Sequence, residues 1–165
     1  MIRSLITILF FLFCFSLEAQ ADVSPQQAQL IMQTDDLLGD HRWFHARETL
    51  RELIPISKPE MQSIYRVKDL EITLLRLNYT VEGFQQLEEL KRIYWDDLTT
   101  LHRILLVLVS RKSITEHIPK EQKLAVAKIL SSRILEIADQ RGDKFKQDRA
   151  FTYAQAVAAY YAETE

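Results

Sequence analysis

The chain has 165 residues, carries a formal net charge of −2 at pH 7, and is 47% hydrophobic and 27% charged. This length suits one domain with a real core, and this composition excludes a disordered chain and a multi-span membrane protein. Only three glycines and four prolines are present, fewer than an all-β domain or a nucleotide-binding α/β domain normally needs at its turns. The composition therefore favours an all-helical fold.

The first 21 residues have the pattern of a cleavable signal peptide. Arg3 provides a positive start, residues 5–17 are almost all apolar, and Ala19-Gln20-Ala21 offers small residues before a cleavage site. The apolar run is shorter than the ~20 residues that span a bilayer, so an uncleaved anchor is the weaker interpretation. We expect cleavage after Ala21 and a single domain over residues 22–165 that has no membrane span.

Cleavage would remove Cys14, the only cysteine of the chain. Small eukaryotic secreted domains usually rely on disulfides, whereas a helical domain of this size in the periplasm can rely on its core. We therefore expect a bacterial periplasmic or secreted protein. The net charge of the remaining domain is still −2, with the two signs interspersed, which argues against a nucleic-acid partner and an anionic membrane surface.

The first two predicted helices form a tight hairpin. Ser24-Pro25-Gln26-Gln27 predicts a helix start with Ser24 as N-cap, and Gly39 is expected to end that helix in the left-handed conformation. Asp40 is expected to cap the second helix, which Pro55 should end. Because the connection is so short, the two helices should be antiparallel.

The next two helices predict a second hairpin. Ser57-Lys58-Pro59-Glu60 repeats the capping pattern and should start a third helix that runs to about Leu77. A fourth helix is expected from an N-cap at Thr80, with apolar residues at spacings of three and four as far as Tyr94.

Three further helices complete the predicted domain. The fifth should start near Asp96 or Asp97, and its apolar run at 104–109 predicts a central helix covered on most sides. Residues 119–141 have the clearest amphipathic pattern, with Gly142 at the stop. The seventh, from about residue 143, alternates alanines and aromatics and has no later helix to cover it.

The sequence of residues 37–56 is partly repeated 37 residues later. The matched pairs are Leu37 and Leu74, Leu38 and Leu75, Leu50 and Leu87, Glu52 and Glu89, Leu53 and Leu90, and Ile56 and Ile93, with Ala46 answered by the equally small Gly83. A period of this size suggests stacked helix pairs, each of which cannot bury its apolar face alone.

This pattern resembles the tetratricopeptide (TPR) family of helix-turn-helix solenoids. The first copy carries the family's large and small packing residues at Leu38-Gly39, Trp43, Ala46, Leu50, Leu53 and Pro55. The second copy keeps Leu75, Gly83, Leu87 and Leu90, but has Thr80 at the aromatic position and no closing proline. The resemblance implies antiparallel hairpins stacked as a short TPR-like α-solenoid of about seven helices, whose concave side binds a peptide or protein without intrinsic catalysis. Since the period exceeds the family's usual 34 residues, a related α-solenoid or a non-repeating helical bundle also fits.

The sequence contains no Gly-x-Ser-x-Gly elbow, no His-Glu-x-x-His motif, no Walker loop and no thiol after the leader. Adjacent carboxylates such as Asp96 and Asp97 point about 100° apart on a helix and do not form an acid/base couple. His41 and His45, with Glu48 three residues on, have the spacing of metal ligands on one helix face. A zinc site needs three or four ligands, so we predict no metal and no cofactor.

Aromatic side chains are the candidates for an interaction surface, because Trp and Tyr anchor interfaces well. These candidates are Trp43, Tyr65, Tyr153, Tyr160 and Tyr161. The expected function is a non-enzymatic adaptor or assembly factor that binds a protein, a peptide or another copy of the chain. A small helical hydrolase acting on envelope polymers and a secreted helical-bundle factor acting on another cell are the alternatives.

Overall fold

The computed structural model describes residues 23–109 and 119–142, which form α-helices and no strand. In chain order the helices are α2 (Pro25–Gly39), α3 (Trp43–Ile56), α4 (Pro59–Leu75), α5 (Thr80–Ile93), α6 (Leu98–Val109) and α7 (Lys120–Gln140). The predicted all-helical class is confirmed, and none of these helices is long and apolar enough to cross a membrane. The leader and the predicted seventh helix lie outside the described residues.

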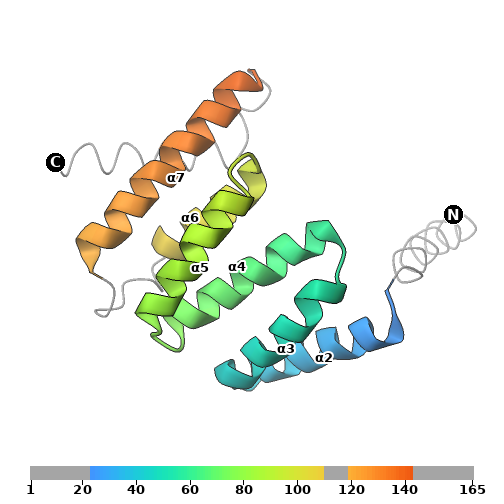
Figure 1. Ribbon diagram of the computed structural model, residues 1–165. Coiled ribbons are helices and arrows are strands. Elements are labelled where there is room, and N and C mark those ends of the chain that lie inside the picture. Colours follow the sequence, from blue (N-terminus) through green and yellow to red (C-terminus); the bar gives the residue numbers. More distant parts are fainter. Residues whose placement is uncertain (1–22, 110–118, 143–165) are drawn as a thin grey trace, which may run out of the picture.

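The helices are arranged as a chain of contacts rather than around one centre. α2 packs on α3, α3 on α4, α4 on both α5 and α6, and α6 on α7. Figure 1 shows α2 and α3 side by side at one end, α6 and α7 at the other, and α4 running diagonally between them. α4 is therefore the element that joins the two ends of the described structure.

Burial divides the apolar side chains into two clusters. The smaller cluster is built from α2 and α3, with Ile72 of α4. The larger contains residues of α4, α5, α6 and α7. Leu70 and Leu74 belong to this larger cluster, so α4 contributes opposite faces to the two cores. Each end thus has its own core, and α4 closes both.

The two hairpins α2–α3 and α4–α5 share local geometry at an offset of 37 residues. α3 and α5 have equal lengths and begin and end 37 residues apart. Their N-cap residues, Arg42 and Tyr79, have φ/ψ of −84°/62° and −82°/71°. The preceding turns contain His41 at φ 58° and Asn78 at φ 56°. The sequence repeat therefore corresponds to a repeated backbone turn and helix start.

The matched apolar positions are also buried in both copies. Leu50 and Leu87 are at most 1% exposed, and Leu53 and Leu90 are buried in the smaller and the larger core, respectively. Ala46 is completely buried in α3. Gly83, its counterpart in α5, lies so close to Leu74 that a side chain has no room. Both copies thus require a small residue where their second helix meets the first.

Several predicted helix boundaries were wrong because the turns are closed by backbone rather than by side chains. Gly39 does not adopt the left-handed conformation, which instead falls on His41. The Arg42 and His41 amides then donate to the Leu37 and Leu38 carbonyl oxygens at 2.9 and 3.2 Å, a Schellman ending. The start of α3 therefore needs no side-chain cap, and Asp40 is not its N-cap.

The predicted N-caps of the second hairpin are also wrong. The N-caps of α4 and α5 are Lys58 and Tyr79, without side-chain hydrogen bonds, in place of the predicted Ser57 and Thr80. The Ser57 hydroxyl donates back to the Leu53 carbonyl oxygen at 2.7 Å. Pro55 does not end α3, which continues to Ile56.

Other predicted boundaries are confirmed. Ser24 caps α2 by accepting a hydrogen bond from the Gln27 amide at 3.2 Å. The Asp97 carboxylate accepts from the Thr99 and Thr100 amides at the start of α6. Gly142 follows α7 with φ 84°. The expected burial of the apolar run of α6 is confirmed except at two residues. Val109 is half-buried, and Leu106 is 37% exposed.

Replacing Gly83 with alanine should destabilise the protein. The added methyl would overlap the buried Leu74 side chain, and overpacking of this kind costs about 1–3 kcal/mol. Urea unfolding followed by circular dichroism should show the loss as a lower midpoint with an unchanged slope.

Gly39→Ala is the matched control, because no atom lies within 4 Å of the added methyl. This variant should be as stable as the parent, or up to about 1 kcal/mol more stable owing to the higher helix propensity of alanine. Equal midpoints for the two variants would contradict the close contact between α4 and α5.

Candidate functional site

A buried arginine is the centre of the densest polar cluster in the described structure. Arg47 lies on the inner side of α3 and is only 4% exposed, and Asp69 of α4 is 7% exposed. Arg47 Nε donates to Asp69 Oδ1 at 2.9 Å. A buried guanidinium needs such a partner, because an unpaired charge in the interior is very costly.

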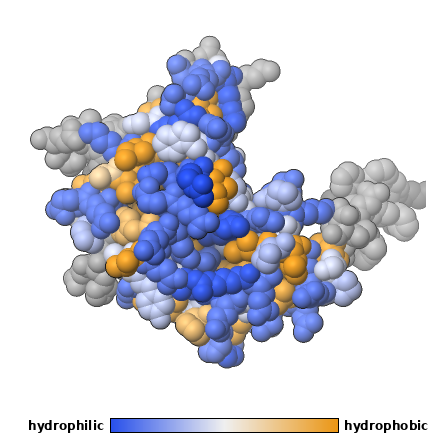
Figure 2. All heavy atoms as spheres, viewed as in Figure 1, coloured by the Kyte–Doolittle hydropathy of each residue, from blue (hydrophilic) through white to orange (hydrophobic). Residues whose placement is uncertain are grey.

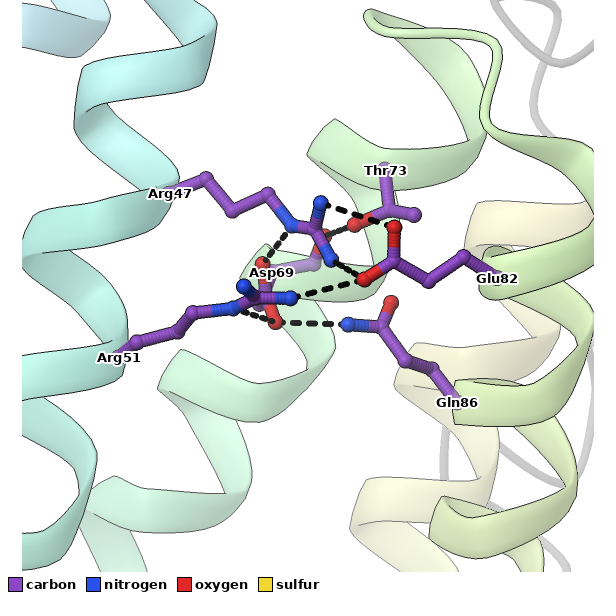
Figure 3. Close-up of polar contacts among 6 residues, drawn as sticks. All are labelled: Arg47, Arg51, Asp69, Thr73, Glu82 and Gln86. Carbon is purple, nitrogen blue, oxygen red and sulfur yellow. Dashed lines mark hydrogen bonds and ion pairs between the residues drawn. The ribbon is translucent and has the colours of Figure 1, made fainter.

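Glu82 of α5 completes the pairing of Arg47 and brings in a second arginine. Both terminal nitrogens of Arg47 donate to the Glu82 carboxylate, which makes the contact bidentate. Arg51, one turn further along α3, donates to Glu82 Oε1 at 2.8 Å and lies 4.0 Å from Asp69 Oδ2. Figure 3 shows these side chains converging from three helices. The cluster therefore ties α3, α4 and α5 together.

Two further groups fix the Asp69 carboxylate and its helix. Gln86 Nε2 of α5 donates to Asp69 Oδ2 at 2.8 Å, and the Thr73 hydroxyl donates to the Asp69 backbone carbonyl oxygen at 2.8 Å. The Tyr79 ring lies with its centre 5.9 Å from the Arg47 guanidinium carbon, at cation–π distance. Asp69 is thus held by hydrogen bonds on both carboxylate oxygens.

The environment raises the pKa values of Asp69 and Arg47 and lowers the pKa of Glu82. Burial raises the pKa of Asp69 above its ordinary value, although Arg47, Arg51 and Gln86 partly oppose this. Burial alone would lower the pKa of Arg47, but its hydrogen bonds and the charges of Glu82 and Asp69 outweigh burial and raise it. The hydrogen bond from Arg47 is the main reason that the pKa of Glu82 is lowered.

The cluster is best explained as a set of structural contacts that hold α3, α4 and α5 together. Each carboxylate is already paired with a guanidinium, and the Thr73 hydroxyl donates to the Asp69 backbone carbonyl oxygen, so these groups are engaged in contacts within and between helices. Arg47 also stands 37 residues before Phe84, a buried residue of the larger core. An arginine at a position that the repeat uses for a core aromatic was the sequence signal that could have revealed this cluster.

The groove between α4 and α6 is the more open candidate for a binding surface. It has a volume of about 360 Å³ and is lined mainly by apolar side chains, with three charged ones at its rim. The lining residues are Ile64, Val67, Lys68, Glu71 and Leu75 of α4, and Arg103, Leu106 and Val107 of α6. Sequence reasoning missed this groove because its walls come from segments about 40 residues apart, which no local pattern joins.

Charge at the groove rim is mostly paired. Lys68 Nζ donates to Glu71 Oε2 at 2.9 Å within α4. Arg103 forms no ion pair with any residue that the structure describes. Ile64 and Leu106 remain 36% and 37% exposed although each is a large apolar side chain. The groove thus offers apolar contact area beside one positive charge.

Trp43 and Tyr65, the two predicted aromatic site residues that the structure describes, both pack against the smaller core. Trp43 is partly buried against the smaller core, with the Arg76 guanidinium carbon 4.8 Å from its ring centre and the His41 ring centre at 5.1 Å. Tyr65 is packed against the same core, and burial and then Asp35 raise the pKa of its hydroxyl. Neither lines the α4–α6 groove. Tyr153, Tyr160 and Tyr161 lie outside the described residues.

The histidines considered as metal ligands contact aromatic rings. The His45 ring lies edge-on to Phe44 at 5.8 Å, and His41 contacts Trp43 as described above. Across residues 23–109 and 119–142 no group of three or more histidine, cysteine, aspartate or glutamate side chains could hold a metal ion. No protein-family model, curated protein or solved structure matches this chain.

Replacing Arg47 with methionine should remove a large part of the stability. Removing one partner of a buried ion pair costs about 3–5 kcal/mol, because Asp69 would stay buried without its main counter-charge. Arg51→Met is the matched control on the same helix, and should cost at most about 1 kcal/mol because the Arg51 side chain is half exposed. Urea unfolding measures both. A double variant with Asp69→Asn should recover part of the loss, and strict additivity would contradict the coupling.

The lowered pKa of Glu82 predicts that the stability of the fold depends on pH, and it fixes the sign of that dependence. The folded chain keeps this carboxylate charged more readily than the unfolded chain, so Glu82 stabilises the fold above about pH 4.5 and loses that effect as the pH falls through its folded pKa. The stability difference between the parent and Glu82→Gln should therefore be largest near pH 7 and shrink below about pH 4. Urea midpoints at a series of pH values test this, and a constant difference would refute it.

Proposed function

We propose that this chain is a non-enzymatic helical-repeat protein of the TPR-like kind, exported to the bacterial periplasm or beyond, that binds another protein. The observation that carries the proposal is the repeated hairpin, whose helix starts and turns match at an offset of 37 residues. Hairpins of such repeats pack on their neighbours and leave an extended surface for binding, and here α4 packs both on α3 of the first hairpin and on α6. The leader-like pattern of residues 1–21 supports export.

The α4–α6 groove is the surface that we assign to the partner. α4 and α6 each begin a hairpin, so the groove lies between the first helices of neighbouring hairpins. An apolar groove between two helices suits the apolar face of a third helix. Arg103 at the rim favours a partner helix that carries a carboxylate beside that face. The occupant that fits is therefore an amphipathic helix with acidic residues along one edge.

Site-specific photo-crosslinking tests this assignment. A benzophenone amino acid placed at Leu106, in the groove, should give a discrete adduct in cells of the organism that encodes the chain. Ile129 on α7 is the matched control, because it is exposed to a similar degree, 46%, but does not line the groove. The adduct should weaken at least about tenfold with Arg103→Glu, since removing a complementary charge or reversing it disfavours the complex.

Two outcomes would overturn the proposal. Adducts of equal yield at positions 106 and 129 would show unspecific contact. No adduct at 106 or at Ile64, the groove residue on α4, would show that the groove has no partner. Mass spectrometry of the adduct also distinguishes another copy of the chain from a different protein.

A further inference from the structure

Each wall of the α4–α6 groove is one stripe of side chains on one helix. On α6 the stripe is Arg103, Leu106 and Val107, and on α4 it runs from Ile64 to Leu75, both at helical spacings of three and four residues. Ile64 and Leu106 are exposed there, although burial of such large apolar side chains is favourable. A third helix with an apolar stripe of its own would cover them.

The end of α7 lies beside the start of α6. Arg133 Nε donates to the Trp95 carbonyl oxygen at 3.2 Å, and Arg141 Nη2 donates to the Asp96 carbonyl oxygen at 3.5 Å. Gly142 follows with φ 84°, the left-handed conformation that ends a helix and turns the chain away from its axis. The chain therefore leaves the described structure beside the first turn of α6, which forms one wall of the groove.

The segment that follows is long enough to run along this wall. Residues 143–165 lie outside the described residues, and their sequence predicts a helix. The 12 residues of α6 extend about 18 Å at the rise of an α-helix, whereas a helix over residues 143–165 would extend about 35 Å. Such a helix could cover the whole length of α6.

The contact at the end of α7 also sets a register. Arg141 and its partner on the α6 side are 45 residues apart in the chain. A helix that ran parallel to α6 from this contact would keep the same offset, because both helices rise equally per residue. Asp148 would then lie at the level of Arg103, and Phe151 at the level of Leu106. One register thus brings a carboxylate to the positive charge of the rim and an aromatic ring to the exposed leucine.

The sequence of the segment supplies a stripe that matches the groove. One face of a helix over residues 148–161 carries side chains that follow one another at spacings of three and four. These are Asp148, Phe151, Ala154, Ala158 and Tyr161. The alanines allow a neighbouring helix to approach closely. An apolar stripe with a carboxylate at its start is complementary to an apolar groove with Arg103 at its rim.

On the basis of the function proposed for this groove, we propose that residues 143–165 form a helix that binds in the α4–α6 groove of the same chain, where the protein partner has to displace it. The segment is tethered at the edge of the groove, so its effective concentration there is high. A partner must compete with this helix, and the competition lowers the apparent affinity of the groove for the partner.

Chemical crosslinking within the chain tests this docking without any partner. Cys14 is the only cysteine, so Cys14→Ser gives a background without thiols. A short bismaleimide should join Leu106→Cys to Ala154→Cys, on the docked stripe. Ala156→Cys is the matched control, because it lies only two residues further but about 160° around a helix. The link to position 154 should form at least about tenfold faster than the link to position 156. Mass spectrometry of tryptic peptides measures each rate.

The charge at the rim tests the register. Arg103→Glu should slow the link between Leu106→Cys and Ala154→Cys at least about threefold, since the new carboxylate would face Asp148. Adding Asp148→Arg should restore the rate, which would not happen if Arg103→Glu had merely damaged the groove. An unchanged rate, or a charge swap that restores nothing, would overturn the proposal.

Competition with the partner is measured with the benzophenone amino acid at Leu106 in cells. Ala154→Asp places a charge on the docked face and should raise the yield of the partner adduct at least about threefold. Ala156→Asp, on the opposite face, should leave that yield unchanged. Equal adduct yields for these two variants would show that the segment does not compete.

Three results of the linking experiment would overturn the docking. Equal rates at positions 154 and 156 would show unspecific contact. Faster linking of Ala154→Cys to Ile129→Cys than to Leu106→Cys would place the segment on the exposed side of α7. A product of twice the mass of the chain would place it in another copy. The partner is judged separately, because linking at position 106 without an adduct in cells supports the docking and removes the partner, and the reverse result does the opposite.

Discussion

The buried guanidinium of Arg47 is the constraint on which the arrangement of the helices depends. Removing a charge from water is so costly that its partners must be supplied with good geometry, and here they come from two other helices, Asp69 of α4 and Glu82 of α5. Apolar packing tolerates small shifts of one helix against another. A bidentate contact does not, so this cluster specifies how the α2–α3 hairpin is set against α4 and α5.

The described helices and several of their ends could be predicted from the sequence, but the N-cap residues of α3, α4 and α5 could not. Helical periodicity is spread over ten or more residues and survives local exceptions. A helix end depends on two or three torsion angles, and here the left-handed positions fall on His41 and Asn78 instead of on glycine. Both residue types tolerate that conformation better than most. The pairing of the two turns at the repeat offset was visible only once these angles were known.

The candidate sites were less predictable for a different reason. Aromatic content indicated Trp43 and Tyr65 as binding residues, yet both are packed against the smaller core and remain predictions as interaction residues. The α4–α6 groove is made by residues that are unremarkable one by one, such as Ile64 and Leu106. Their significance comes from which helices are neighbours, and that depends on tertiary packing rather than on any local pattern.

The two separate cores determine which part of the described structure can unfold on its own. The α2–α3 hairpin is held by its own apolar cluster, by one face of α4 and by the Arg47 contacts, so it forms a natural unit for partial unfolding while the larger core stays intact. The backbone amides of the α2–α3 hairpin should therefore exchange with solvent faster than those of the larger core. When the hairpin detaches, it exposes Ile72 and thus an apolar face of α4 that is buried in the folded chain.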